Sequence, residues 1–180
     1  MIKPGAVLLG LALFLPGAAR AGQGALPNGY GKATWGMSRA ELLSAYRIVL
    51  APPPEANGEG VWAVEGPSPG ELTVSGAAIG EEEVRSVSFG FHPRWGLTIV
   101  HVRLKQAQPS QSLESWLRKE AARYGPPTAQ EPGSKAAWEN GTTHLELTFH
   151  RVSPLHPSPS DHLALVLWSV ALRSKIEAEE

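Results

Sequence analysis

Residues 84–124 limit the possible folds of this 180-residue chain more than any other stretch, because two strand patterns are followed directly by a helix pattern. Apolar and polar side chains alternate over residues 84–92, and a period of two predicts a half-buried β-strand. Residues 92–96 contain a proline and a glycine, which favour a tight turn. Residues 97–105 alternate again, so the stretch begins with a predicted β-hairpin.

An amphipathic helix is predicted after this hairpin. Its apolar side chains recur at helical spacing and form one stripe: Leu113, Trp116, Leu117, Ala121 and Tyr124. Ser110 or Ser112 is the predicted N-cap, and a glycine followed by two prolines marks the end of the helix. Because Trp116 lies in the middle of the stripe, we predict that it is buried against Phe89 or Val100 of the hairpin.

The remaining elements predict an α+β fold. Ser38 and Glu41 form a capping box that begins a helix ending near Tyr46. Further strands are predicted at residues 61–64, 71–78, 136–139, 142–150 and 162–170, with loops at residues 51–60, 126–134 and 153–160. A helix followed by strands, twice along the chain, predicts an antiparallel, twisted sheet with helices on one face.

These elements predict a single α+β domain over residues 34–172. A flexible segment over residues 22–33 precedes it, and a charged tail or short helix over residues 173–180 follows it. The domain divides into two pseudo-repeated α-then-β halves, about 34–106 and 107–172. Each half contains a proline-rich loop, a strand with a tryptophan and a glycine turn, which indicates an internal duplication.

The N-terminal residues predict export. A lysine precedes an apolar run over residues 6–15, and Ala19-Arg20-Ala21 is a small-x-small cleavage site, so residues 1–21 form a predicted secretory signal peptide. The run is shorter than the roughly 20 residues that cross a bilayer, so we predict no membrane span. Removal of 21 of the 180 residues leaves 159, beginning with Gly22.

Charge and cysteine content exclude several classes of partner. The signal peptide takes two basic residues with it, so the mature chain has 14 basic and 17 acidic side chains, which is not the charge pattern of a nucleic-acid-binding protein. The chain contains no cysteine, so it has no disulfide framework, and we predict no lipid anchor. These features favour a periplasmic or secreted bacterial protein. No cofactor is predicted.

Two capping motifs resemble those of known exported proteins. The helix start Trp35-Gly36-Met37-Ser38 and the helix end Tyr124-Gly125-Pro126-Pro127 resemble the "W-G-M-S" and "Y-G-x-P" motifs of small exported bacterial α+β proteins. The layout is similar to that of the outer-membrane assembly lipoproteins of the SmpA/BamE type and of the tandem-repeat β-lactamase inhibitor proteins. The resemblance implies a meander of strands bracketed by helices.

Polar residues on one predicted strand give the best candidates for metal ligands. His144, Glu146 and His150 share one face of the strand, and His162 on the last strand lies opposite if the two strands pair. Imidazole and carboxylate groups bind zinc, and neighbouring positions on one strand face are about 7 Å apart. We favour an ordinary polar, solvent-facing strand because the ligand spacings of known zinc sites are absent. No metal site is therefore predicted.

Three other features have a chemical and a structural interpretation. The residue types of a hydrolytic triad occur near the last strand, at Ser153, Ser158, Ser160 and Asp161, but no nucleophile-elbow sequence frames a serine. Three consecutive glutamates at residues 81–83 are interpreted as a solvated turn. Trp95 and Arg94 lie at the tip of the predicted hairpin, where Trp95 either contacts a partner or packs under a helix.

The sequence contains no catalytic motif, so we predict no catalytic residues and a non-enzymatic binding or interaction module. Another envelope protein is the expected partner, recognised by the open face of the sheet or by hairpin tips. The alternative hypothesis is a metal-dependent or hydrolytic enzyme that uses the histidine-bearing strand face. The two hypotheses differ in whether His144, Glu146, His150 and His162 converge in one pocket.

Overall fold

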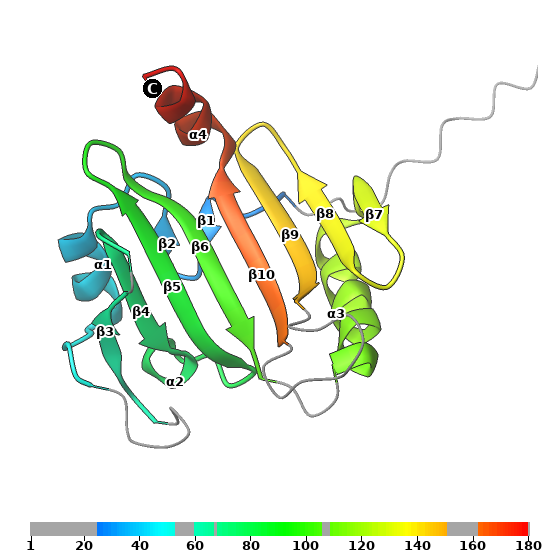
Figure 1. Ribbon diagram of the computed structural model, residues 1–180, viewed down its shortest axis with the longest axis horizontal. Coiled ribbons are helices and arrows are strands. Elements are labelled where there is room, and N and C mark those ends of the chain that lie inside the picture. Colours follow the sequence, from blue (N-terminus) through cyan, green and yellow to red (C-terminus); the bar gives the residue numbers. More distant parts are fainter. Residues whose placement is uncertain (1–24, 53–59, 67, 106–108, 151–161, 180) are drawn as a thin grey trace, which may run out of the picture.

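The computed structural model describes residues 25–52, 60–66, 68–105, 109–150 and 162–179. Within these residues the fold is α+β, with an antiparallel eight-stranded sheet and four helices (Figure 1). The strands of the sheet are β3 Ala63–Glu65, β4 Glu71–Ser75, β5 Val84–His92, β6 Gly96–Leu104, β7 Ala129–Glu131, β8 Lys135–Glu139, β9 Thr143–His150 and β10 His162–Ser169. The helices are α1 Arg39–Tyr46, α2 Gly76–Ile79, α3 Pro109–Tyr124 and α4 Val170–Glu177.

The strand order in the sheet is β3-β4-β5-β6-β10-β9-β8-β7. Strands β3 to β6 form a meander, β7 to β10 form a second one, and the last strands of the two meanders pair at the centre. A separate two-stranded sheet joins β1 Gly29–Tyr30 and β2 Ala33–Thr34. The central β6–β10 pairing joins segments far apart in the sequence and is what unites the two halves.

One face of the sheet is apolar from β3 to β8. Alternation places Val100 of β6 opposite Phe89 of β5 and opposite Leu167 of β10, and all three side chains are fully or almost fully buried. The next row along the strands includes Val102, Val87 and Leu165, and the buried residues of β8 and β9 continue it. Burial of these side chains provides the main stabilisation of the fold.

Helices α1 and α3 pack against this apolar face through Leu42, Leu113 and Tyr124, which belong to the buried core. The C-terminal helix α4 lies elsewhere: its Ile176 lines a groove with Ile99 and His101, which alternate with the core residues of β6. The structure therefore does not confirm the prediction that the helices share one face. Among the described helices, none combines the length and the apolar character needed to cross a membrane.

The predicted start of the first helix is confirmed. The Ser38 side chain accepts a hydrogen bond from the Glu41 backbone N–H, and Glu41 in turn accepts one from the Ser38 N–H. The predicted start of α3 is wrong, because the helix begins at Pro109 and includes Ser110 and Ser112. Proline suits the first turn of a helix because its missing N–H has no intrahelical acceptor there.

Several other boundaries differ from the sequence prediction. The strand predicted at residues 71–78 ends at Ser75, whose hydroxyl caps the short helix α2. The loop predicted at residues 126–134 contains β7. The segment 22–33, predicted to be flexible, contains β1 and part of β2 within its described residues. Of the two alternatives given for residues 173–180, a charged tail or a short helix, the structure shows the helix, which begins earlier, at Val170, and ends at Glu177. Short, polar elements of this kind depend on tertiary contacts more than on local propensity.

Trp116 is less deeply buried than the sequence predicts. The side chain packs against the core but is only partly buried, and it lines a cavity with Val84 and Leu104. The predicted helix face is therefore correct and the predicted depth is wrong. A cavity lies beside the ring, and the Lys119 ammonium lies 4.1 Å from the ring centre, so closely packed apolar neighbours do not surround the side chain completely.

Candidate functional site

The face of the sheet opposite the core holds the four predicted metal-ligand candidates. On β9, His144, Glu146 and His150 alternate with the buried Leu145 and Leu147. His162 of β10 is the cross-strand partner of His150. The structure thus places all four residues on the same polar face, as alternation predicts.

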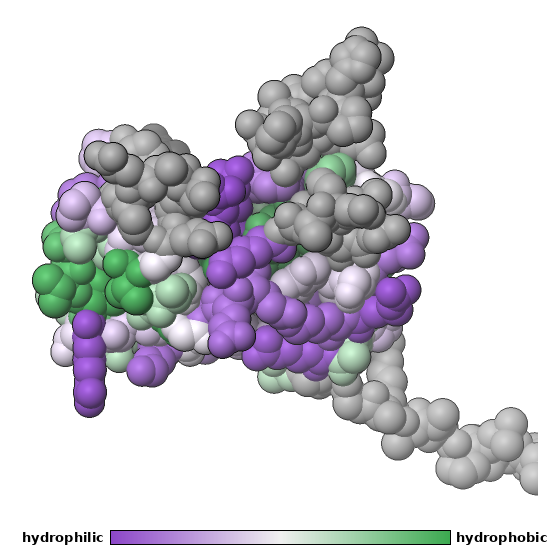
Figure 2. Space-filling view, turned by 90° about the horizontal axis from the view of Figure 1, so that it is seen from below, coloured by the Kyte–Doolittle hydropathy of each residue, from purple (hydrophilic) through white to green (hydrophobic). Residues whose placement is uncertain are grey.

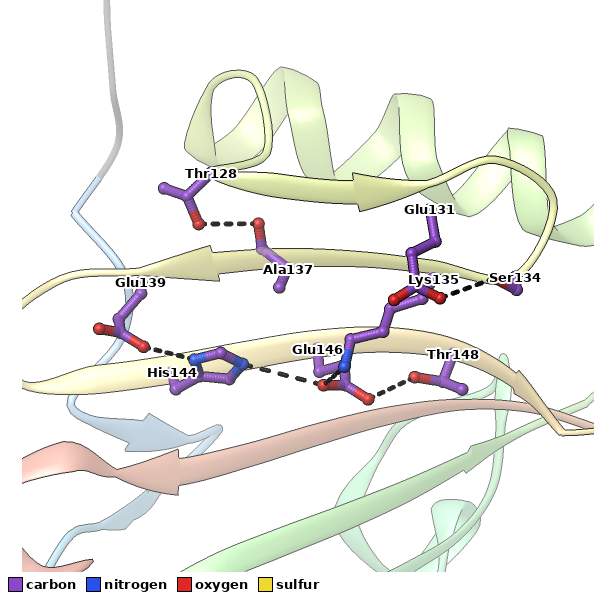
Figure 3. Close-up of polar contacts among 9 residues, drawn as sticks. All are labelled: Thr128, Glu131, Ser134, Lys135, Ala137, Glu139, His144, Glu146 and Thr148. Atoms are coloured by element: carbon purple, nitrogen blue, oxygen red, sulfur yellow. Dashed lines mark hydrogen bonds and ion pairs between the residues drawn. The ribbon is translucent and has the colours of Figure 1, made fainter.

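His144 is held between two carboxylates (Figure 3). Its Nδ1 lies 2.6 Å from an oxygen of Glu139 on β8, and its Nε2 lies 3.9 Å from Glu146. The ring stacks on Trp168 of β10 with a centroid distance of 3.8 Å. Nε2 is buried and has no hydrogen-bond partner among the described residues. These contacts fix the orientation of the imidazole.

Glu146 is engaged by a cation and a hydroxyl. Lys135 of β8 approaches one carboxylate oxygen at 2.6 Å, and the Thr148 hydroxyl donates to the other at 2.7 Å (Figure 3). Burial acts to raise the pKa of Glu146, but the hydrogen bonds from Lys135 and Thr148 outweigh it and lower the pKa below its ordinary value. Glu146 is therefore an ionised carboxylate with both oxygens already in use.

The other two histidines form a separate pair. His150 and His162 stack with a centroid distance of 5.0 Å, whereas the residue opposite His144 is Trp168. Burial, together with the nearby charge of His162, lowers the pKa of His150. His144 and His150 lie near opposite ends of β9, so the four candidates do not converge. Within the described part of the chain, no group of three or more histidine, aspartate and glutamate side chains is arranged to hold a metal ion.

The predicted triad residues Ser153, Ser158, Ser160 and Asp161 lie outside the described residues. Glu81, Glu82 and Glu83 are all exposed. Glu83 forms an ion pair with Lys119 of α3. The polar network on β8 and β9 consequently orients side chains and satisfies charges.

The hairpin tip predicted for interaction is occupied by contacts within the chain. The Arg94 guanidinium lies 4.8 Å and the Lys175 ammonium 5.0 Å from the centre of the Trp95 ring. Arg94 also forms an ion pair with Glu179 at 2.7 Å. Trp95 is thus partly buried, with a basic side chain of α4 over its ring, and the contact of this tip with a partner stays a prediction.

A groove runs over the polar face between β4, β5, β6 and α4. Its volume is about 360 Å³, and its lining includes Glu71, Gly90, Ile99, His101 and Ile176. The volume lies at the lower end of the range for small-molecule sites. The groove is broad and open to solvent, so it is better suited to contact with a partner's surface than to enclosing a small molecule.

The most exposed apolar residues lie at the β3 edge of the sheet, and sequence analysis did not identify them. The side chains of Val49, Leu50 and Val61 have exposed fractions of 82%, 46% and 73%. They flank the bridge between Ala51 and Ala63, which adds one residue pair beyond β3. Figure 2 shows an apolar patch at the end of the molecule that carries α1 and β3. We call Val49, Leu50 and Val61 the edge patch.

A signal for the edge patch is present in the sequence. Ile48, Val49 and Leu50 are three consecutive apolar residues that follow a helix and precede a proline-rich loop. Such a run indicates either a buried strand or an exposed contact segment, and periodicity alone does not distinguish the two. The structure favours the exposed segment over the buried strand, because no described element covers Val49.

Comparisons with models of known protein families, with curated proteins and with solved structures found no match.

Proposed function

We propose that this chain is a non-enzymatic binding module of the bacterial periplasm or extracellular space, and that the edge patch binds another envelope protein. The observation that carries the proposal is the exposure of Val49, Leu50 and Val61 at one edge of the sheet. Exposed large apolar side chains that gather in one place mark interaction surfaces, because their burial is favourable only when a partner covers them.

The backbone next to the edge patch supports a particular kind of partner. Ala51 directs both its N–H and its C=O to Ala63, at 2.8 and 3.1 Å. In an antiparallel ladder the neighbouring residue directs its backbone groups the other way, so Leu50 presents them to the outer edge. An extended segment of the partner adds a strand there, and its apolar side chains cover Val49 and Val61.

We also infer that the two halves are a duplicated unit, as the resemblance to tandem-repeat exported proteins implies. Tyr46 ends α1 and Tyr124 ends α3, and in each half the first bridging residue, Ala51 or Ala129, follows five residues later. The next residue after each helix has positive φ, 55° at Arg47 and 86° at Gly125.

Photo-crosslinking in the producing bacterium tests the proposal. Val61 is replaced by a photo-crosslinking amino acid in the full chain, and products are identified by mass spectrometry. We expect a discrete adduct with another envelope protein, and we expect Val49→Asp in the same chain to abolish it. The matched control carries the photo-crosslinking residue at Arg118, which is exposed on α3 and should give no adduct. Absence of any adduct at residue 61, or adducts between copies of this chain alone, would overturn the proposal.

The proposal also includes export of the chain from the cytoplasm, which a separate experiment tests. The predicted signal peptide, residues 1–21, lies outside the described residues. We expect the mature chain to begin at Gly22, as read by mass spectrometry of protein purified from the envelope fraction. An intact N-terminus in the cytoplasmic fraction contradicts export and removes the envelope partner from the proposal.

A further inference from the structure

A cavity opens between α3 and the β7–β8 end of the sheet, at the edge opposite the edge patch (Figure 1). Its volume is about 570 Å³, which lies within the range of small-molecule sites. Helix α3 packs mainly against β9 and β10, so β8 and β7 extend beyond the area that the helix covers. The cavity is therefore separate from the edge patch and from the groove on the polar face.

The inner wall of this cavity is apolar. Its lining includes Leu113 and Leu117 from α3, Ala136 from β8 and Phe149 from β9. Leu113 and Ala136 belong to the buried core, so the cavity reaches the core. The next core-facing residue along β8 is Trp138, which is only 2% exposed. The small side chain of Ala136 leaves open the kind of space that Trp138 fills further along the strand.

The charged side chains in the lining balance each other. They are two acidic and two basic residues: Glu114, Glu131, Arg118 and Lys135. Arg118 and Glu114 lie 4.0 Å apart and are both largely exposed, and Lys135 is bound to Glu146 on the polar face at 2.6 Å. A cavity with equal numbers of opposite charges attracts neither an anion nor a cation selectively.

We propose that this cavity binds an uncharged, largely apolar small molecule built on one or two rings. The rings cover the leucines of α3 and Ala136 and displace water from them, which is favourable in proportion to the apolar area removed from water. A rigid ring system also loses little conformational freedom on binding. At about 30 Å³ for each water-sized group, the volume admits up to roughly 20 non-hydrogen atoms. The Gln130 amide in the lining provides a hydrogen-bond partner for one hydroxyl or carbonyl group of the ligand.

Calorimetric titration of the mature chain with three bicyclic compounds of similar size tests the site. Naphthol is uncharged at neutral pH, naphthoate is an anion and naphthylmethylammonium is a cation. We expect saturable binding of naphthol, and affinities lower by roughly 10-fold or more for the two charged compounds, because each gives up hydration of its charge and meets as many like charges as opposite ones. The absence of saturable naphthol binding, or equal or tighter binding of either charged compound, would overturn the proposal.

Ala136→Leu tests the position of the ligand. The larger side chain occupies part of the cavity, so the affinity for naphthol should fall by roughly 10-fold or more. The matched control is Ala129→Leu, because Ala129 is exposed on the neighbouring strand β7 and does not line the cavity. Its affinity should equal that of the wild type, and circular dichroism checks that both variants fold. Equal naphthol affinity in Ala136→Leu and the wild type contradicts the proposed site.

Nuclear magnetic resonance of the wild-type chain gives a second measurement that requires no substitution. Addition of naphthol should shift the methyl signals of Leu113, Leu117 and Ala136, which line the cavity. The methyl signals of Ile99 and Ile176, which line the groove on the polar face, should stay unchanged. Shifts at Ile99 and Ile176 without a shift at Ala136 would assign the binding to the groove and refute the proposed site.

Discussion

Phe89 and Trp116 show at the scale of single residues that position in a layer matters more than side-chain size. Phe89 is fully buried in the central row of the sheet, whereas the larger Trp116 is only partly buried on α3. We expect Phe89→Ala to lower the free energy of unfolding by about 3–5 kcal/mol, because it removes apolar burial and leaves a void. Trp116→Ala should cost only about 1–2 kcal/mol, because its ring is partly solvated already.

Urea unfolding of both variants, monitored by circular dichroism, checks this order. A loss for Trp116→Ala as large as that for Phe89→Ala would show that Trp116 is as deeply buried as its place in the apolar stripe predicts.

The polar network of β8 and β9 leads to a second prediction at the residue scale. Glu146 is already engaged by Lys135 and Thr148, and His144 by Glu139 and Trp168. Zinc binding would have to displace these partners, so we expect the purified mature chain to retain no stoichiometric zinc after dialysis, as measured by elemental analysis. Retained zinc that is released by His144→Ala or Glu146→Ala would replace the interaction-module proposal with a metal site.

At the scale of elements, the β5–β6 hairpin is fixed to the segment that precedes α1. Leu97 donates a backbone hydrogen bond to Met37, and Gly36 donates one to Leu97. Gly96 has a φ of 67°, and a Cβ atom there would lie 2.3 Å from the Gly36 carbonyl oxygen. Glycine is therefore needed both for its backbone conformation and for the close approach.

Gly96→Ala should destabilise the chain more than Gly133→Ala. Gly133 has a similar φ of 74°, but a Cβ atom there would meet no described atom within 4 Å, so its substitution adds only backbone strain, about 1–2 kcal/mol. The clash at Gly96 should add about 1–3 kcal/mol to that cost. Thermal unfolding of the two variants measures the difference. Equal losses would mean that the hairpin tip moves away from α1 without penalty.

At the scale of the whole molecule, the two meanders share one core. Val100 and Val102 of the first half are cross-strand partners of Leu167 and Leu165 of the second half, and all four side chains are buried. Neither half covers its own apolar rows, so we expect a single cooperative unfolding transition. Far-ultraviolet circular dichroism and tryptophan fluorescence should give coincident urea curves. Two separate transitions would show that the halves fold independently.

The burial or exposure of individual side chains is what the sequence determines least. Helical spacing places Glu120 on the apolar stripe of α3, four residues after Trp116 and four before Tyr124. A charged residue at such a position is ordinarily assigned to solvent, but α3 packs against β9 and β10, and Glu120 is only 3% exposed. In the same way, the exposure of Val61 depends on what lies beside β3, which no local pattern describes.

The sequence by itself determined the local structure that short-range physics controls: the alternation of β5, β6 and β9, the Ser38–Glu41 capping box and the apolar stripe of α3. Tertiary structure decided the rest. The pairing of Val100 with Leu167 joins residues 67 positions apart, and alternation is satisfied equally by any neighbour strand with the same apolar face. Strand order, the position of α4 and the depth of Trp116 follow from that long-range choice, because burial depends on which surfaces meet and not on the residue alone.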